Sequence, residues 1–135
     1  MNYLFDFNTL GVEGIGPSMA SFQKIYEEYP ISGECDDVFS FIDKKFKNIT
    51  SGLDEPVSVV IVDPPRSGFG LEASQKLVEI CDKTCFIAFL ACDPATFARD
   101  SRIFIQAGFK ISECFLFDAF AQTPHYELLI CFERS

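Results

Sequence analysis

Three short segments of the chain carry side chains that could do chemistry, and each lies beside an apolar run typical of a strand. Asp63 opens the sequence Asp-Pro-Pro-Arg, Cys92 precedes Asp-Pro-Ala-Thr, and Glu127 follows Pro-His-Tyr. A cysteine thiolate is a strong nucleophile, and carboxylates serve as general bases or as acceptors for bound ligands. These three residues are therefore the first candidates for a functional site.

Cys92 stands directly before a predicted helix, because Asp93 can cap that helix and Pro94 suits its first position. The unpaired N–H groups and the positive end of the helix dipole favour the thiolate form of a nearby cysteine. The neighbouring carboxylate of Asp93 acts in the opposite direction. The position nevertheless suits a nucleophile better than those of Cys81 and Cys131, which lie inside apolar runs.

Each candidate also has a purely structural interpretation. Asp63 can form a turn before a proline, Cys92 can be a small buried residue, and Glu127 can be a solvated acid at the edge of a sheet. The sequence leaves these alternatives open for each residue alone, whereas their joint placement at strand ends favours a site.

The chain alternates between patterns of strand and helix. We predict strands at 4–13, 57–62, 85–91, 110–118 and 126–133, and helices at 17–29, 38–47, 71–81 and 94–107. The run 57–62 is almost continuously β-branched and so predicts a buried parallel strand. This alternation of strands and helices indicates a doubly wound α/β sheet whose last two strands are antiparallel. Ligands of such sheets bind at the carboxyl ends of the strands.

Composition indicates one folded domain over residues 1–135, because 48% of the residues are hydrophobic. The apolar runs are far shorter than the ~20 residues of a membrane span, and no signal peptide is recognisable, so we expect an intracellular, cytoplasmic protein. Twenty acidic against 11 basic residues give a net charge of −9. A free-standing nucleic-acid binder normally has a basic patch that neutralises phosphates, and this acidic chain has the opposite sign of charge. If the protein acts on RNA, we expect something other than this chain to hold the RNA.

The six cysteines do not form a recognisable metal motif, and we predict no metal site. We expect four of them to be reduced residues in or near the core, where cysteine behaves as a small hydrophobe: Cys81, Cys85, Cys114 and Cys131. The glycines at 11, 14 and 16 do not fit the dinucleotide-binding pattern, since position 19 is methionine.

The chain resembles the S-adenosylmethionine-dependent RNA (uracil-C5) methyltransferases, which make 5-methyluridine in tRNA and rRNA. The resemblance rests on residues 60–68 (VIVDPPRSG), 91–100 (ACDPATFARD) and 117–127 (FDAFAQTPHYE), and it covers residues 57–135 almost continuously. The family usually has serine where this chain has Ala91. The resemblance implies a Rossmann-like methyltransferase sheet, S-adenosylmethionine as cofactor and RNA as substrate. We favour tRNA over rRNA, because the sequence shows no cysteine-rich cluster segment of the kind found in some rRNA-acting relatives.

The same resemblance implies roles for five residues. Cys92 corresponds to the nucleophile that adds to C6 of uracil, and Glu127 corresponds to the base that removes the C5 proton. Asp63 corresponds to a cofactor-binding residue. Glu13 corresponds to the acid that binds the cofactor ribose, and Glu34 is a candidate for the adenine end, although a solvated turn acid is an equal alternative.

If Glu13 ends the second strand of that fold, the first strand and its glycine loop lie upstream of residue 1, and the domain is N-terminally incomplete. Two hypotheses follow. The chain is either the catalytic part of an RNA uracil methyltransferase or a non-catalytic module that keeps the fold for binding or interaction. The sequence does not give the oligomeric state.

Overall fold

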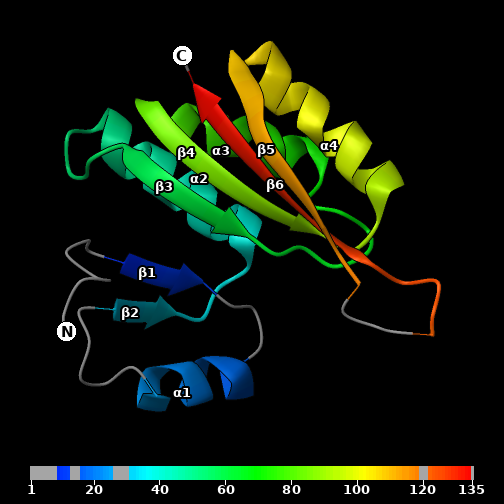
Figure 1. The fold of residues 1–135 in the computed structure, drawn as a ribbon. Helices are drawn as coiled ribbons and strands as arrows, with labels where there is room; N and C mark the ends of the chain where they lie inside the picture. Colours follow the sequence, from blue (N-terminus) through cyan, green and yellow to red (C-terminus); the bar gives the residue numbers. More distant parts are fainter. Residues whose placement is uncertain (1–8, 13–15, 26–30, 119–121, 135) are drawn as a thin grey trace, which may run out of the picture. The chain divides into compact units, whose positions relative to one another are not determined.

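The computed structural model describes residues 9–12, 16–25, 31–118 and 122–134 (Figure 1). Within it the chain forms two compact units, one comprising residues 1–44 and the other residues 45–135. None of the helices in the described ranges is long and apolar enough to cross a membrane.

The first unit contains a two-stranded parallel sheet, in which Thr9 pairs with Ile31 and Val12 pairs with Glu34. Its elements are β1 (Thr9–Val12), α1 (Gly16–Ile25), β2 (Ile31–Glu34) and the start of α2 (Val38–Thr50). The strand and helices predicted here agree with β1, α1 and α2 where the residues are described, whereas the sequence pattern does not predict β2. Its sequence, Ile-Ser-Gly-Glu, carries one large apolar side chain and so lacks the pattern of a strand.

The second unit is built on a four-stranded sheet with the order β3-β4-β6-β5. The strands are β3 (Val57–Val62), β4 (Cys81–Ala91), β5 (Phe109–Phe117) and β6 (Glu127–Arg134). As predicted, β3 and β4 are parallel, and β5 and β6 are antiparallel. The structure adds that β6 lies beside β4 and runs antiparallel to it. The helix α3 (Leu71–Ile80) joins β3 to β4, and α4 (Pro94–Gln106) joins β4 to β5.

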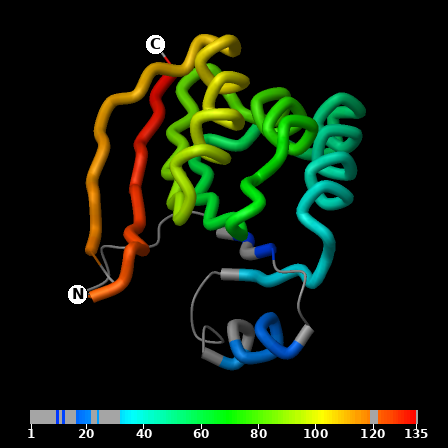
Figure 2. Tube along the Cα trace, turned by 90° about the vertical axis from the view of Figure 1, so that its right-hand side faces the viewer, coloured from blue at the N-terminus to red at the C-terminus, as the bar shows by residue number. Residues whose placement is uncertain are grey.

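A cluster of aromatic rings forms the core between this sheet and its helices. Phe104 of α4 is fully buried and packs against Phe132 of β6 at 5.3 Å, Phe89 of β4 at 6.1 Å and Phe109 of β5 at 6.4 Å between ring centroids. Figure 2 shows α3 and α4 on the same side of β5 and β6. The strands and α4 are therefore fixed to one another by burial of aromatic surface, to which favourable ring pairs add roughly 0.5–1.5 kcal/mol each.

Two predictions about burial were wrong. The strand β3 was expected to be buried, yet Val59 is 51% and Ile61 is 80% exposed. β3 is an outer strand of the described sheet, and its side chains alternate between two faces. Val59 and Ile61 lie on the exposed face, whereas Val62 is buried on the opposite face. Cys114 was expected in or near the core, but it is exposed because β5 is the opposite outer strand. Cys81, Cys85 and Cys131 are buried free thiols, as expected.

Candidate active site

The carboxyl ends of β3 and β4 and the amino end of β6 lie at one edge of the second sheet. In the antiparallel pairing of β4 with β6, Ala91 is opposite Leu128. Cys92 directly follows Ala91, and Glu127 directly precedes Leu128, so the two candidates occupy the next position along the same ladder. The topology thus brings together two residues that are 35 positions apart in the sequence.

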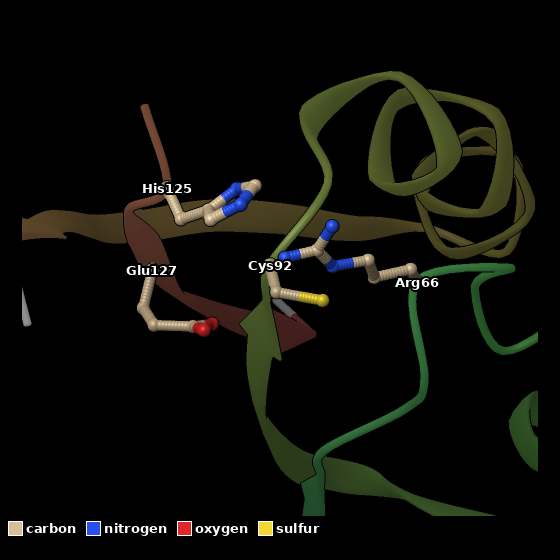
Figure 3. A pocket seen from close by; sticks show the side chains of 4 residues that line it. All are labelled: Arg66, Cys92, His125 and Glu127. Carbon is tan, nitrogen blue, oxygen red and sulfur yellow. The ribbon is translucent and has the colours of Figure 1, made fainter. Parts of the chain in front are cut away.

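A pocket of about 240 Å³ opens at this edge, and the described residues that line it are Arg66, Cys92, His125 and Glu127. Figure 3 shows Cys92 between the other side chains, with Arg66 extending toward it from one side and Glu127 from the other. Cys92 and Glu127 are half-buried, whereas Arg66 and His125 are exposed. The arrangement combines a nucleophile, a carboxylate, a guanidinium and an imidazole around one small space.

The helix α4 begins at Pro94, two residues after Cys92, with Asp93 between them as its N-cap. The Asp93 carboxylate accepts a hydrogen bond from the backbone N–H of Thr96 at 2.9 Å, and Pro94 occupies the first helical position, as the sequence predicts. This hydrogen bond lowers the pKa of Asp93. The cap fixes the helix start, and with it the backbone that carries Cys92.

Arg66 and His125 were not predicted as site residues. Arg66 lies in the loop after β3, and His125 lies just before β6, where its backbone N–H donates to the Thr123 hydroxyl at 3.3 Å. Both residues lie in the segments that carry the family resemblance, and this is the feature of the sequence that could have identified them as candidates. Their roles could not be derived from spacing, because they meet Cys92 only through the pairing of strands.

The two predicted cofactor-binding residues that the structure describes, Asp63 and Glu34, do not line this pocket. Asp63 directly follows β3 and is exposed, but it is not among the described residues that line the pocket. Glu34 ends β2 in the first unit, where it forms an ion pair of 2.8 Å with Lys44 that raises the pKa of Lys44. Glu13 lies outside the described residues. No group of three or more potential metal ligands clusters in the described part of the chain.

Known proteins share both sequence and fold with this chain. An uncharacterised RNA methyltransferase from Aquifex aeolicus is 36% identical over 88 residues, which are 65% of this chain and 20% of that protein. The 23S rRNA (uracil(1939)-C(5))-methyltransferase RlmD of Colwellia psychrerythraea is 40% identical over 77 residues, which are 56% of this chain and 16% of that protein. The matched part therefore spans about a fifth of these relatives or less.

Solved structures show the same methyltransferase fold. The N-methyltransferase NodS of Bradyrhizobium japonicum aligns with 93% of this chain and 72% of its own, at a TM-score of 0.68 and 13% identity. The complex of M1.HpyAVI with SAM aligns with 93% of this chain and 55% of its own, at a TM-score of 0.56 and 10% identity. The family model for tRNA (uracil-5-)-methyltransferase matches residues 24–135. The chain therefore belongs to the tRNA (uracil-5-)-methyltransferase family.

Proposed function

We propose that this chain carries the catalytic pocket of an S-adenosylmethionine-dependent methyltransferase that methylates C5 of a uridine in RNA, with tRNA as the first substrate to test. The observation that carries the proposal is the placement of Cys92 and Glu127 at one pocket. A thiol and a carboxylate on opposite sides of a small space suit a reaction that needs a nucleophile and then a base. The tRNA preference follows the name of the matching family, and a relative named for rRNA makes rRNA the comparison substrate.

The size of the pocket supports a single heterocyclic ring as its occupant. Its volume of about 240 Å³ is below the ~300–1,000 Å³ typical of sites for larger ligands. A base inside an RNA helix cannot reach such a pocket, so the target uridine has to be flipped out of its stack. The polar lining then provides hydrogen-bond partners for the ring, with Arg66 and His125 at its exposed side.

The reaction starts when the Cys92 thiol gives up its proton to solvent and the thiolate adds to C6 of uracil. The new S–C6 bond moves the electron pair of the C5–C6 double bond toward C5 and O4, which makes C5 nucleophilic. Arg66 lines the same pocket and supplies a positive charge against the enolate oxygen. S-adenosylmethionine, when bound, supplies the methyl group that C5 accepts and departs as neutral S-adenosylhomocysteine.

Glu127 completes the reaction. Its carboxylate removes the proton from C5, the released electron pair restores the C5–C6 double bond, and the C6–S bond breaks to return the Cys92 thiolate. The position of Glu127 opposite Cys92 across the pocket supports this division of roles. The products are 5-methyluridine, S-adenosylhomocysteine and one proton, which passes from Glu127 to solvent, while the Cys92 thiolate takes back from solvent the proton that it gave up at the start.

Asp63 is the described residue that best fits a role in holding the cofactor. It is exposed at the carboxyl end of β3, where α/β sheets bind their ligands, and its carboxylate makes no hydrogen bond or ion pair within the described ranges. It can therefore accept a hydrogen bond from an amino or hydroxyl group. Glu34 is paired with Lys44 and would have to exchange that partner for the cofactor.

The proposal is tested by incubating the purified chain with 5-fluorouridine-containing tRNA and S-adenosylmethionine. Fluorine at C5 cannot be removed by Glu127, so methylation should leave a covalent protein–RNA complex that is visible on a denaturing gel. Cys92→Ala should abolish the complex, and Cys114→Ala, which removes an exposed thiol from β5, should retain it. A complex that persists in Cys92→Ala assigns the chemistry to another thiol. Absence of any complex with folded protein on tRNA and on rRNA supports the non-catalytic alternative.

A further inference from the structure

We propose that Asp100 of α4 is a positioning residue, which anchors the loop of residues 66–70 and thereby sets where Arg66 stands against Cys92. The inference deepens the proposed function, and it rests on that function only for the role of Arg66 in the reaction. It concerns a side chain that lies outside the pocket lining and acts through the loop that carries Arg66.

Asp100 is a carboxylate with no exposed surface, although it belongs to a residue type that is almost never fully buried without partners. Its Oδ2 accepts hydrogen bonds from the backbone N–H groups of Phe69 at 2.8 Å and Gly70 at 3.0 Å. Its Oδ1 accepts a hydrogen bond from Nε of Arg99 at 2.8 Å. The buried charge is therefore directed at the backbone of the loop.

Two further side chains of α4 bind the same loop. Arg99 donates from Nη2 to the carbonyl oxygen of Ser67 at 3.0 Å. The Thr96 hydroxyl shares its proton between the carbonyl oxygens of Asp93 at 3.1 Å and Arg66 at 3.3 Å. Together with Asp100, these residues form what we call the α4 clamp: Thr96, Arg99 and Asp100. The clamp forms hydrogen bonds with the backbone of four of the five loop residues 66–70, including Arg66 itself.

Gly68 shows how closely the loop approaches the clamp. Its φ is +85°, and a Cβ added there would lie 2.6 Å from Nη2 of Arg99 and 2.6 Å from Oδ2 of Asp100. Glycine is needed both for the positive φ and for the close approach. The loop thus lies against α4 in a conformation that a side chain at position 68 would disturb.

The same helix also determines the position of Cys92. Its N-cap, Asp93, is the residue after Cys92, so the backbone of the nucleophile leads directly into α4. One helix therefore holds the thiol through the chain and the guanidinium of Arg66 through the clamp. Because the Arg66 side chain is exposed, its backbone anchor is the contact that limits where it can reach.

The test compares how fast Cys92 reacts with iodoacetate, which is anionic, and with iodoacetamide, which is neutral. Mass spectrometry of the peptide containing Cys92 gives both rates at low ionic strength, where charge effects are least screened. The ratio of the two rates reports the positive charge near the sulfur. Removing that charge with Arg66→Ala should lower the ratio about two- to fivefold, as expected for a unit charge a few ångströms away in water.

Asp100→Asn should lower the ratio in the same direction, because the released loop lets Arg66 move away from the sulfur. The local charge effect of the substitution is opposite, since losing an anion favours the anionic reagent, so a lower ratio distinguishes positioning from simple electrostatics. In the Arg66→Ala background, Asp100→Asn should not lower the ratio further. The matched control is Asp82→Asn, which makes the same change at the far end of β4, where Asp82 accepts a hydrogen bond from Ser58.

Gly68→Ala provides a second variant that changes no charge, in case Asp100→Asn does not fold. It should also lower the ratio, because the added methyl group pushes the loop off the clamp. Its control is Gly108→Ala, since Gly108 has a similar φ of +91° with nothing within 4 Å of an added Cβ. An unchanged ratio in folded Asp100→Asn or Gly68→Ala overturns the inference. The inference is also overturned if Asp100→Asn lowers the ratio as much in the Arg66→Ala background as it does in the unaltered protein. Since alkylation needs neither RNA nor cofactor, these outcomes are independent of whether the chain methylates uridine.

Discussion

Cys92 and Glu127 extend the β4–β6 ladder by one position beyond the pair formed by Ala91 and Leu128. The relationship between the two residues therefore depends on the register of two antiparallel strands and not on either loop alone. A slip of one residue in that register would turn every side chain of β6 to the other face of the sheet. The aromatic core, which uses Phe132 of β6, opposes such a slip.

Glu127→Gln should trap the reaction after methyl transfer. The amide keeps the size of the carboxylate but cannot take the C5 proton, so the methylated ring should remain bonded to Cys92 with ordinary uridine-containing RNA. Intact mass spectrometry should detect this adduct, and turnover should fall at least a hundredfold, in line with typical general-base contributions. Glu133→Gln, the same change at the other end of β6, should turn over normally. Rapid turnover by Glu127→Gln would remove Glu127 from the role of base.

Asp63→Ala should weaken binding of S-adenosylmethionine by roughly tenfold, the effect of losing one hydrogen bond to a charged acceptor. Isothermal titration calorimetry measures the change directly. Glu72→Ala, which removes an exposed carboxylate from the first turn of α3, should bind as tightly as the unaltered protein. Equal affinities for the two variants would show that Asp63 does not contact the cofactor.

Phe104→Ala should lower the free energy of unfolding by about 3–5 kcal/mol, because it leaves a cavity among three aromatic neighbours. Urea denaturation at neutral pH provides the measurement. Phe115→Ala makes the same change on β5, where the side chain is 44% exposed, and should cost less than half as much. Similar losses at both positions would contradict the central place of Phe104 in the core.

Stability should fall in acid, and Asp100 should account for part of the fall. Burial alone would raise the pKa of Asp100, but hydrogen bonds from Arg99 and from the N–H groups of Gly70 and Phe69 outweigh it and hold the pKa below its usual value. A lowered folded-state pKa gives stability that is present above the unfolded value of ~3.9 and is lost as the pH falls through the folded value.

Urea denaturation between pH 7 and pH 3 measures the free energy of unfolding. Below about pH 4, this free energy should fall less steeply with pH for Asp100→Asn than for the unaltered protein. Glu79→Gln, which neutralises an exposed acid on α3, should keep the original slope. If the free energy of unfolding fell equally steeply in Asp100→Asn, the hydrogen bonds to the Asp100 carboxylate would not stabilise the folded state.

Much of the second unit could be predicted from the sequence, because its local signals agree with its tertiary structure. The Asp93-Pro94 pair marks the start of α4, and the apolar runs mark β3, β4 and β6 within a few residues of their observed bounds. The convergence of Cys92 and Glu127 follows from parallel and antiparallel connections that the order of elements already implies.

Other features depend on contacts that no local pattern encodes. The strand β2 is held by pairing with β1, not by its own composition. The exposure of Ile61 and Cys114 depends on which strands are outermost in the described sheet. The burial of Asp100 could not be predicted either, since an aspartate in the middle of a helix usually faces solvent, and its partners are about 30 residues away.

The attachment of α4 to both Cys92 and the loop of Arg66 places one half of the pocket on a single helix. Glu127, in the other half, begins β6, and the buried Phe104 of α4 packs against Phe132 of that strand. A displacement of α4 that widened the pocket would have to separate these buried rings. The pocket is therefore pre-organised, because the aromatic core that stabilises the fold also maintains its shape.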